Sequence, residues 1–219
     1  PWCCGRDHGG GKGDLTLRGG GQLSVQNDAY AQGGVAASPS ALLVLARNMS
    51  LSGEQTQITA ASSGNLDASP IKIAATGGTV IEDHPDFATL AASGSLSIGR
   101  GSSINGNTSG SGRGASIAIK AGTVTLDGAG GIASISSESM RSIVATQNVT
   151  GDGGSVEIVA SRLLLNNGGQ IKTSTMTAGH AGVASLVADS ILIDGGNNPQ
   201  VLTGIIGSTN SAGDSGKLS

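Results

Sequence analysis

Aromatic side chains are nearly absent from this chain, whose 219 residues include one Trp, one Tyr and one Phe. Globular proteins commonly use aromatic residues as the bulkiest material of a central core. A core here must instead be built from Ile, Leu, Val and Ala. Because hydrophobic residues still make up 37% of the chain, the composition argues against both an ordinary globule and a disordered polar tract.

Charged residues are also scarce: they make up 12% of the chain, against about 25% in typical globular domains. With a net charge of −3 and no basic patch with interleaved aromatic residues, the sequence indicates no nucleic-acid partner. The two cysteines, Cys3 and Cys4, are adjacent, which excludes a disulfide scaffold. The longest apolar run, residues 41–46, is far shorter than the ~18 residues of a membrane-spanning helix.

Glycine, in contrast, is abundant, with 38 residues, and it marks out a degenerate repeat. One copy reads GRGASIAIKAGTVTLDGAGGIASIS over residues 112–136, and the next reads GDGGSVEIVASRLLLNNGGQIKTST over residues 151–175. Residues 182–194 repeat part of the pattern, and residues 213–219 open a further copy. Repetition at this period predicts a solenoid of stacked units. The unfinished last copy leads us to expect a piece of a longer protein.

Each copy alternates apolar and polar residues over short runs, as at Ile117 and Ile119 and again at Val124 and Leu126. Period-two alternation is typical of β-strands. Each unit is therefore predicted to hold three short strands joined by tight corners of Gly, Asn and Asp. Strands of successive units would pair in parallel, which predicts an all-β fold of about 6–8 coils at a spacing of about 4.8 Å.

Aligning the units assigns each apolar residue to a column that runs through the stack. Six residues are predicted to point inward: Ile119, Leu126, Ile158, Leu165, Leu186 and Ile193. The same alignment places Ile132 opposite Ile171 in the third strand.

Three regions follow from this alignment. Residues 1–12 form an irregular N-terminal segment, and residues 13–219 form the repeat region, truncated at its C-terminal end. An irregular insertion is expected near residues 76–92. Because residues 71–92 resemble a unit with an insertion or deletion, their register stays open.

The corner after the second strand carries Asp127, Asn166 and Asp194 at equivalent positions. Asn and Asp are common in turns because they tolerate a left-handed backbone. Turn chemistry is the favoured interpretation. A stacked ladder of Asn and Asp side chains is the alternative.

The phrase GDGGSVEIVASRLLLNNGGQIKTS at 151–174, and its weaker form at 112–136, resembles the repeat of filamentous-haemagglutinin-type exoproteins. The resemblance covers residues 13–219 and implies a right-handed parallel β-helix. It implies a structural and adhesive shaft segment of a large secreted bacterial surface protein, outside the cell or on the outer membrane. The implied partners are a glycan or protein of a host or neighbouring cell, and an outer-membrane transporter of the two-partner type. The family's N-terminal secretion domain has no counterpart in this sequence.

The densest polar cluster, Glu82, Asp83, His84 and Asp86, lies in the irregular insertion. Carboxylates beside a histidine are candidates for binding Ca²⁺ or for acid–base chemistry. A carbohydrate-active β-helix enzyme, a polysaccharide lyase or hydrolase, is therefore the alternative function. Such enzymes draw acids from several coils, whereas these acids share one short segment. A solvated loop is the favoured interpretation, and we expect no catalytic residue, no metal and no cofactor.

Other candidate sites in the sequence have simpler interpretations. Cys3, Cys4 and His8 could ligate a metal, but a single Cys pair in a Gly-rich segment favours a chance cluster. His180 is expected to be structural. An ice-binding solenoid would need a strict Thr array, which the mixed outward positions lack. Open ends of a stack would favour end-to-end self-association.

Overall fold

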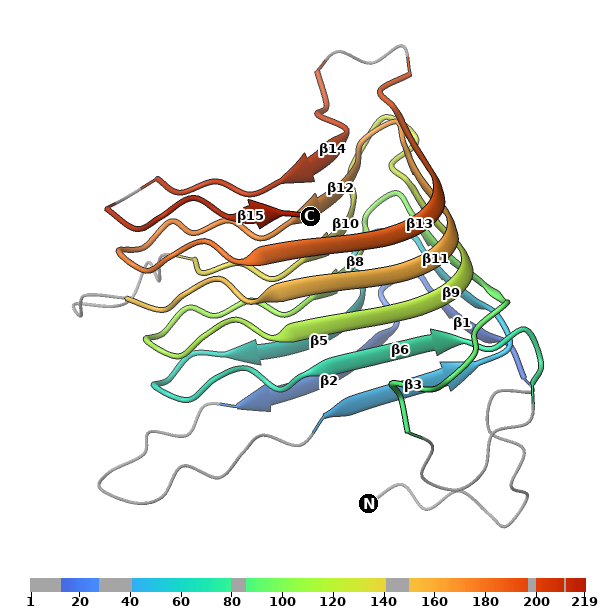
Figure 1. The fold of residues 1–219 in the computed structure, drawn as a ribbon, viewed down its shortest axis with the longest axis horizontal. Helices are drawn as coiled ribbons and strands as arrows, with labels where there is room; N and C mark the ends of the chain where they lie inside the picture. The colour runs from blue at the N-terminus through green and yellow to red at the C-terminus, as the bar shows by residue number, and fades with distance from the viewer. Residues whose placement is uncertain (1–12, 28–40, 80–85, 141–149, 197–199, 211) are drawn as a thin grey trace.

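The computed structural model describes residues 13–27, 41–79, 86–140, 150–196, 200–210 and 212–219. Every regular element in these ranges is a β-strand. The described part accordingly contains no helix long and apolar enough to cross a membrane. Figure 1 shows the strands stacked in chain order, from the N-terminal units at the bottom to the C-terminal units at the top.

The larger of two parallel sheets has nine strands. Its main path runs β1 (Leu15–Arg18), β4 (Met49–Ser52), β7 (Ser95–Gly99), β9 (Ser116–Asp127), β11 (Ser155–Asn166), β13 (Val183–Asp194) and β15 (Lys217–Leu218). Two more strands, β3 (Leu42–Ala46) and β6 (Ile71–Ala75), continue the column below the first half of β9. Each of the long strands β9, β11 and β13 therefore occupies, as one continuous strand, the positions that two separate strands occupy in the earlier units.

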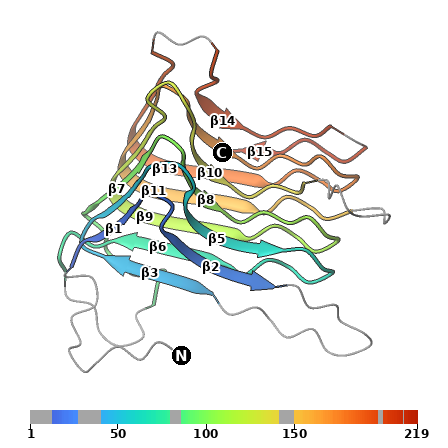
Figure 2. The ribbon, with the colours of Figure 1, turned by 180° about the vertical axis from the view of Figure 1, so that it is seen from behind.

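The smaller sheet takes one strand from each of six units. In spatial order these are β14 (Gly204–Ile206), β12 (Gly169–Lys172), β10 (Ala133–Ser136), β8 (Ser102–Asn105), β5 (Thr56–Ser62) and β2 (Gln22–Asn27). Figure 2 shows this sheet with the molecule turned by 180° from the view of Figure 1. The chain returns to the larger sheet after each strand of the smaller one. Each strand therefore runs in the same direction as its counterpart in the next unit, and the pairings are parallel.

The core lies between the two sheets and consists of aligned columns of Ile, Leu, Val and Met. In the smaller sheet a single column contains Leu23, Ile58, Ile104, Ile135, Ile171 and Ile205. In the larger sheet one column contains Leu17, Leu51, Ile98, Leu126, Leu165 and Ile193. Most members are fully buried, and burying one such side chain contributes roughly 1.5–3 kcal/mol.

The predicted register is confirmed for the larger sheet and wrong at one point in the smaller. Ile135, and not Ile132, pairs with Ile171, and Ile132 is 47% exposed. The alignment assumed the same corner length in each unit. The corner at residues 128–132 is longer than the corner at residues 167–168, so the strand that follows it begins later and Ile132 belongs to the corner.

The predicted inward positions are buried except in the last full unit. Ile119, Leu126, Ile158 and Leu165 are at most 1% exposed. Leu186 is only partly buried against the core, and Ile193 is 46% exposed although it pairs in register with Leu165. In the described part, β15 pairs with β13 only at Val183 and Ala184, so the far half of β13 has no strand above it.

The open register at residues 71–92 is resolved by strand pairing. Ile71 pairs with Leu42 on one side and with Ile117 on the other. β6 is therefore the first strand of its unit, and β7 is the second. The residues between Ala75 and Ser95 that the structure describes form turns and irregular chain, so the insertion interrupts the unit between its first two strands.

The corner after the second strand is built by turn chemistry. Asp127 and Asp194 each accept a hydrogen bond from a backbone N–H two residues further on, at Ala129 and Gly196. Asn167 and Gly168 have positive φ angles of 47° and 99°, a conformation that Asn and Gly adopt most readily. The Nδ2 of Asn167 also donates to Asp127 Oδ1 at 3.3 Å, which ties two neighbouring corners together.

The edge of the stack opposite this corner is narrow and rich in glycine and hydroxyl groups. A Cβ at Gly154 would overlap the carbonyl oxygen of Ala115, and a Cβ at Gly182 would overlap that of Gly154. Isolated bridges continue the stacking there through Ser62, Thr108, Ser139, Thr175 and Thr209. The repeated glycines therefore permit close approach of backbones from successive units.

We expect Leu165→Asp to lower the free energy of unfolding by roughly 3–5 kcal/mol, because it creates a void and buries an unpaired charge in an apolar column. Leu192→Asp is the matched control, since Leu192 points outward and is exposed. Urea unfolding followed by circular dichroism measures both. Equal midpoints for Leu165→Asp and the wild type would contradict the register.

Candidate functional site

Only one residue of the predicted acidic cluster lies in the described part. Glu82, Asp83 and His84 lie outside the described residues. Asp86 is exposed, and its Oδ1 accepts a hydrogen bond from the backbone N–H of Ala88 at 3.0 Å. This contact closes a turn, so the described geometry gives Asp86 a structural role.

The residues after Asp86 are held against the outer face of the larger sheet by two lysines. The Phe87 ring centroid lies 5.8 Å from Lys72 Nζ and 5.5 Å from Lys120 Nζ. Lys120 Nζ also donates to the carbonyl oxygen of Ala88 at 2.6 Å. Cation–π contacts and this charge-assisted hydrogen bond fix the segment on the sheet.

Of the other sequence candidates, the structure describes only His180. Cys3, Cys4 and His8 lie outside the described residues, and among the described ones no group of three or more His, Cys, Asp or Glu side chains could hold a metal ion. The Nδ1 of His180 accepts a hydrogen bond from the backbone N–H of Asp214, and the backbone N–H of His180 donates to Asp152 Oδ1. These contacts link the corners of successive units, as expected for a structural histidine.

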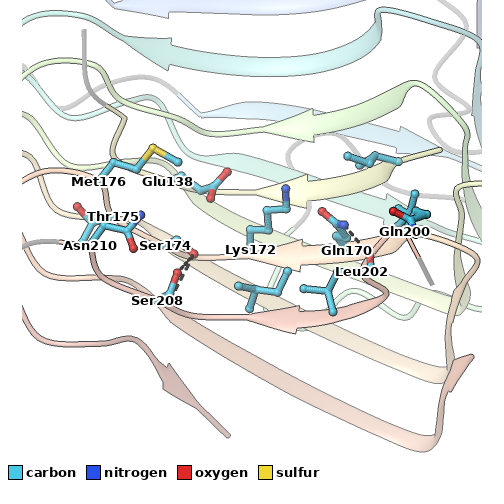
Figure 3. Close-up of a pocket in the computed structure, with 13 residues that line it drawn as sticks. Glu138, Gln170, Lys172, Ser174, Thr175, Met176, Gln200, Leu202, Ser208 and Asn210 are labelled. Carbon is cyan, nitrogen blue, oxygen red and sulfur yellow. Dashed lines mark hydrogen bonds between the residues drawn. The ribbon is translucent and has the colours of Figure 1, made fainter. Parts of the chain in front are cut away.

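An open pocket of about 390 Å³ lies on the outer face of the smaller sheet. Its floor is formed by outward residues of β12 and β14, by Ile132 and Glu138 on either side of β10, and by the chain just after β12 and β14 (Figure 3). Residues 200–202, from the corner between β13 and β14, form one wall. Glu138, Gln170 and Lys172 supply the polar groups that bear most directly on binding.

Strand periodicity explains why these side chains share one face. Ile135 and Ile171 point into the core, so the residues on either side of each point outward. Ser134 pairs with Gln170, and Ser136 pairs with Lys172. Glu138 continues the same alternation after β10, and Ser174 continues it after β12.

Glu138 and Lys172 carry the charges of the pocket. Burial raises the pKa of the Glu138 carboxyl above its ordinary value of 4.5, and the positive charge of Lys172 opposes this by lowering the pKa. The Glu138 backbone N–H donates to Asn107 Oδ1 at 2.9 Å. The residue is thus fixed on the sheet while its carboxyl faces the pocket beside Lys172 (Figure 3).

Gln170 has the most unusual environment in the pocket. It is 4% exposed, because the 200–202 wall lies over it, and its Nε2 donates to the carbonyl oxygen of Leu202 at 2.6 Å. A carbonyl oxygen can only accept, so this bond fixes which amide atom is the nitrogen. The buried Oε1 is left without a hydrogen-bond partner.

Exposed apolar side chains border these polar groups. Ile132, Met176 and Leu202 line the pocket and are 47%, 44% and 62% exposed. Ile132 is also the residue that sequence alignment had assigned to the core. Apolar walls with a few convergent polar groups are typical of small-molecule binding sites.

Sequence reasoning did not identify this pocket. The period-two pattern places Gln170 and Lys172 on the outer face, as the alternation around Ile171 requires. The pattern gives no signal for the wall, because residues 200–202 belong to an irregular corner of the next unit. The useful signal is the length of that corner, which is much longer than the corner before β12.

Comparisons with family models, curated proteins and solved structures find no match to this chain.

Glu138→Gln is expected to raise the melting temperature relative to the wild type at pH 7, and the difference should shrink towards pH 4. A raised pKa means that the fold favours the neutral carboxyl. The stability that the neutral Glu138 carboxyl contributes to the wild type is fully present below pH 4.5. It is lost as the pH rises through the pKa of Glu138 in the folded protein.

Glu157→Gln on the exposed face of β11 is the matched control for this measurement. Thermal melts at a series of pH values would measure all three proteins. A melting-temperature difference for Glu138→Gln that does not change with pH, or that favours the wild type at pH 7, would contradict the expected direction.

Proposed function

We propose that this chain is part of a right-handed parallel β-helix that serves as a structural and adhesive shaft segment of a large secreted bacterial exoprotein of the filamentous-haemagglutinin type. The observation that carries the proposal is the in-register pairing of successive units. β11 pairs with β9 through eleven residue pairs and with β13 through the same number. The repeat phrase resembling that family lies in these units.

The mechanism of such a shaft is mechanical. Each unit contacts its neighbours through backbone hydrogen bonds and through the shared apolar columns. Because contacts are made to adjacent units, stability accumulates as units are added and the cross-section stays constant. The product is a stiff spacer that would hold binding regions away from the cell surface.

The outer face of the smaller sheet suits an adhesive role. Its outward positions carry Gln57, Ser103, Asn105, Ser136 and Lys172. Several of these groups bond to one another, including Ser136 Oγ to Asn105 Oδ1 at 2.9 Å. We propose a surface glycan or protein of a host or neighbouring cell as the partner. Export to the cell surface would use an outer-membrane transporter of the two-partner type.

The enzyme alternative has less support than the adhesive function. Of the acidic cluster on which it rests, the structure describes only Asp86, which closes a turn. In the pocket over the smaller sheet, Glu138 is the one carboxylate among the described lining residues. Glycoside hydrolysis with two carboxylates requires a second one about 5–10 Å away. We therefore propose binding without turnover.

Beads that carry the purified chain should be retained on monolayers of epithelial cells or of Gram-negative bacteria, because the folded outer faces are the adhesive element. Beads carrying Leu165→Asp should be retained less, since that variant weakens the fold. Counting bound beads under flow measures the effect. Retention no better than that of bare beads on both monolayers would contradict adhesion. Shortening of neutral or acidic polysaccharides during the incubation would favour the enzyme.

We also expect chains to associate end to end, with the open far half of β13 in one copy meeting β1 of another. Ile191 and Ile193 lie in core columns but are exposed there, and an unpaired strand edge invites pairing with another chain. Heterologous contacts of this kind do not close into a ring by themselves, so they build open chains.

In sedimentation velocity, the wild type should form larger species as its concentration rises, and Ile193→Lys should reduce them. Leu192→Lys is the control, since Leu192 lies on the outer sheet face. A wild type that sediments as a monomer throughout the concentration series would refute end-to-end association.

A further inference from the structure

We infer that the pocket formed by Glu138, Gln170, Lys172 and the 200–202 wall binds a neutral hexose unit of a glycan chain. The inference rests on the proposed adhesive function and assigns it a site and a ligand class. Three properties of the pocket point to this ligand: an unpaired buried acceptor, a balanced pair of charges and an apolar border.

The unpaired acceptor is Gln170 Oε1. The residue is 96% buried, its Nε2 is used by Leu202, and its oxygen has no partner. A buried acceptor without a donor is rare in native structures and calls for an explanation. Because Gln170 lines the pocket (Figure 3), a ligand that donates a hydrogen bond there would satisfy it.

One Glu beside one Lys leaves the pocket without a net charge, so the pocket does not favour a strongly ionic ligand. Glu138 would repel a phosphate, sulfate or carboxylate, and Lys172 would repel a cation. Lys172 Nζ is a donor, whereas the Glu138 carboxylate and Gln170 Oε1 are acceptors. Neighbouring hydroxyl groups on one sugar ring can donate to both acceptors and accept from the ammonium. A neutral polyhydroxy ligand therefore matches all three groups.

The apolar border fits the carbon face of a sugar ring. Ile132, Met176 and Leu202 present exposed apolar surface around the polar groups. The volume, about 390 Å³, is within the range of roughly 300–1,000 Å³ found for small-ligand pockets. The site is large enough for a ring, and its open form lets the rest of a glycan chain extend beyond it.

A peptide fits the pocket less well. Extended peptides usually bind sheets by adding a strand at a free edge. This pocket lies on the face of the smaller sheet, where β10, β12 and β14 are already paired with one another. Within the described part, the free edge of this sheet nearest the pocket is the outer side of β14, so a peptide that adds a strand would pair at that edge and not on the face that forms the pocket.

The test uses saturation-transfer NMR with the purified chain and three neutral hexose hexamers: cellohexaose, maltohexaose and mannohexaose. We expect at least one hexamer to receive saturation from the wild type. Gln170→Met removes the acceptor while keeping the length of the side chain, and it should weaken binding at least about tenfold. Lys172→Met should also weaken it.

Gln57→Met is the matched control. Gln57 occupies the same outward column of the smaller sheet as Gln170, but it lies outside the pocket and its Oε1 is paired with Asn105 Nδ2. This variant should bind the hexamer as the wild type does. In the wild type, the side-chain amide resonances of Gln170 should shift on adding the sugar, a readout that does not depend on the folding of any variant.

The inference is overturned if no neutral hexamer receives saturation, if Gln170→Met binds as tightly as the wild type, or if the Gln170 resonances do not shift. Preference for hexagalacturonate or for a hexapeptide would also overturn it. Bead adhesion separates the two proposals. If the beads still adhere but the chain binds no sugar, the adhesive function is supported and the pocket is not its binding site. If the beads do not adhere and the chain binds no sugar, both proposals are contradicted.

Discussion

Register between neighbouring units is the constraint on which the rest of this structure depends. A strand that slipped by one residue would turn its apolar side chains outward and its Ser, Thr and Lys side chains into the core. Parallel pairing at matched residues prevents this, and it sets Ile above Ile and Leu above Leu through the stack. The glycine-lined narrow edge, the Asp and Asn corners and the outward polar face all occur at fixed places because this register is kept.

Much of the core was predictable from the sequence, and the physical reason is local. Alternation with period two identifies the buried face of a strand, which is why Ile158 and Leu165 were assigned correctly. Corner length is not encoded in that alternation, so Ile132 was placed in the core where Ile135 belongs. Burial also depends on what lies on the next unit, which is why Ile193 keeps its column but remains exposed.

In the pocket over the smaller sheet, too, strand alternation predicts some features and cannot predict others. The outward positions of Gln170 and Lys172 follow from the inward position of Ile171. The covering of Gln170 follows from a long irregular corner in another unit, and the pattern of the strand carries no information about it. A side chain that is unremarkable in sequence thereby becomes a buried acceptor without a donor. The candidate binding pocket of this stack forms where an irregular corner meets a regular face.

The matched columns have an evolutionary consequence. Recombination between two copies of the repeat would delete or duplicate a whole unit and rejoin Leu or Ile to an equivalent Leu or Ile, so each column would remain continuous. A deletion of an odd number of residues within a strand would break the alternation and turn the rest of that strand over. Selection would therefore tolerate changes in length that come in whole units, while corners would be free to diverge within each one. The length of such a protein can change by steps without a new core having to evolve.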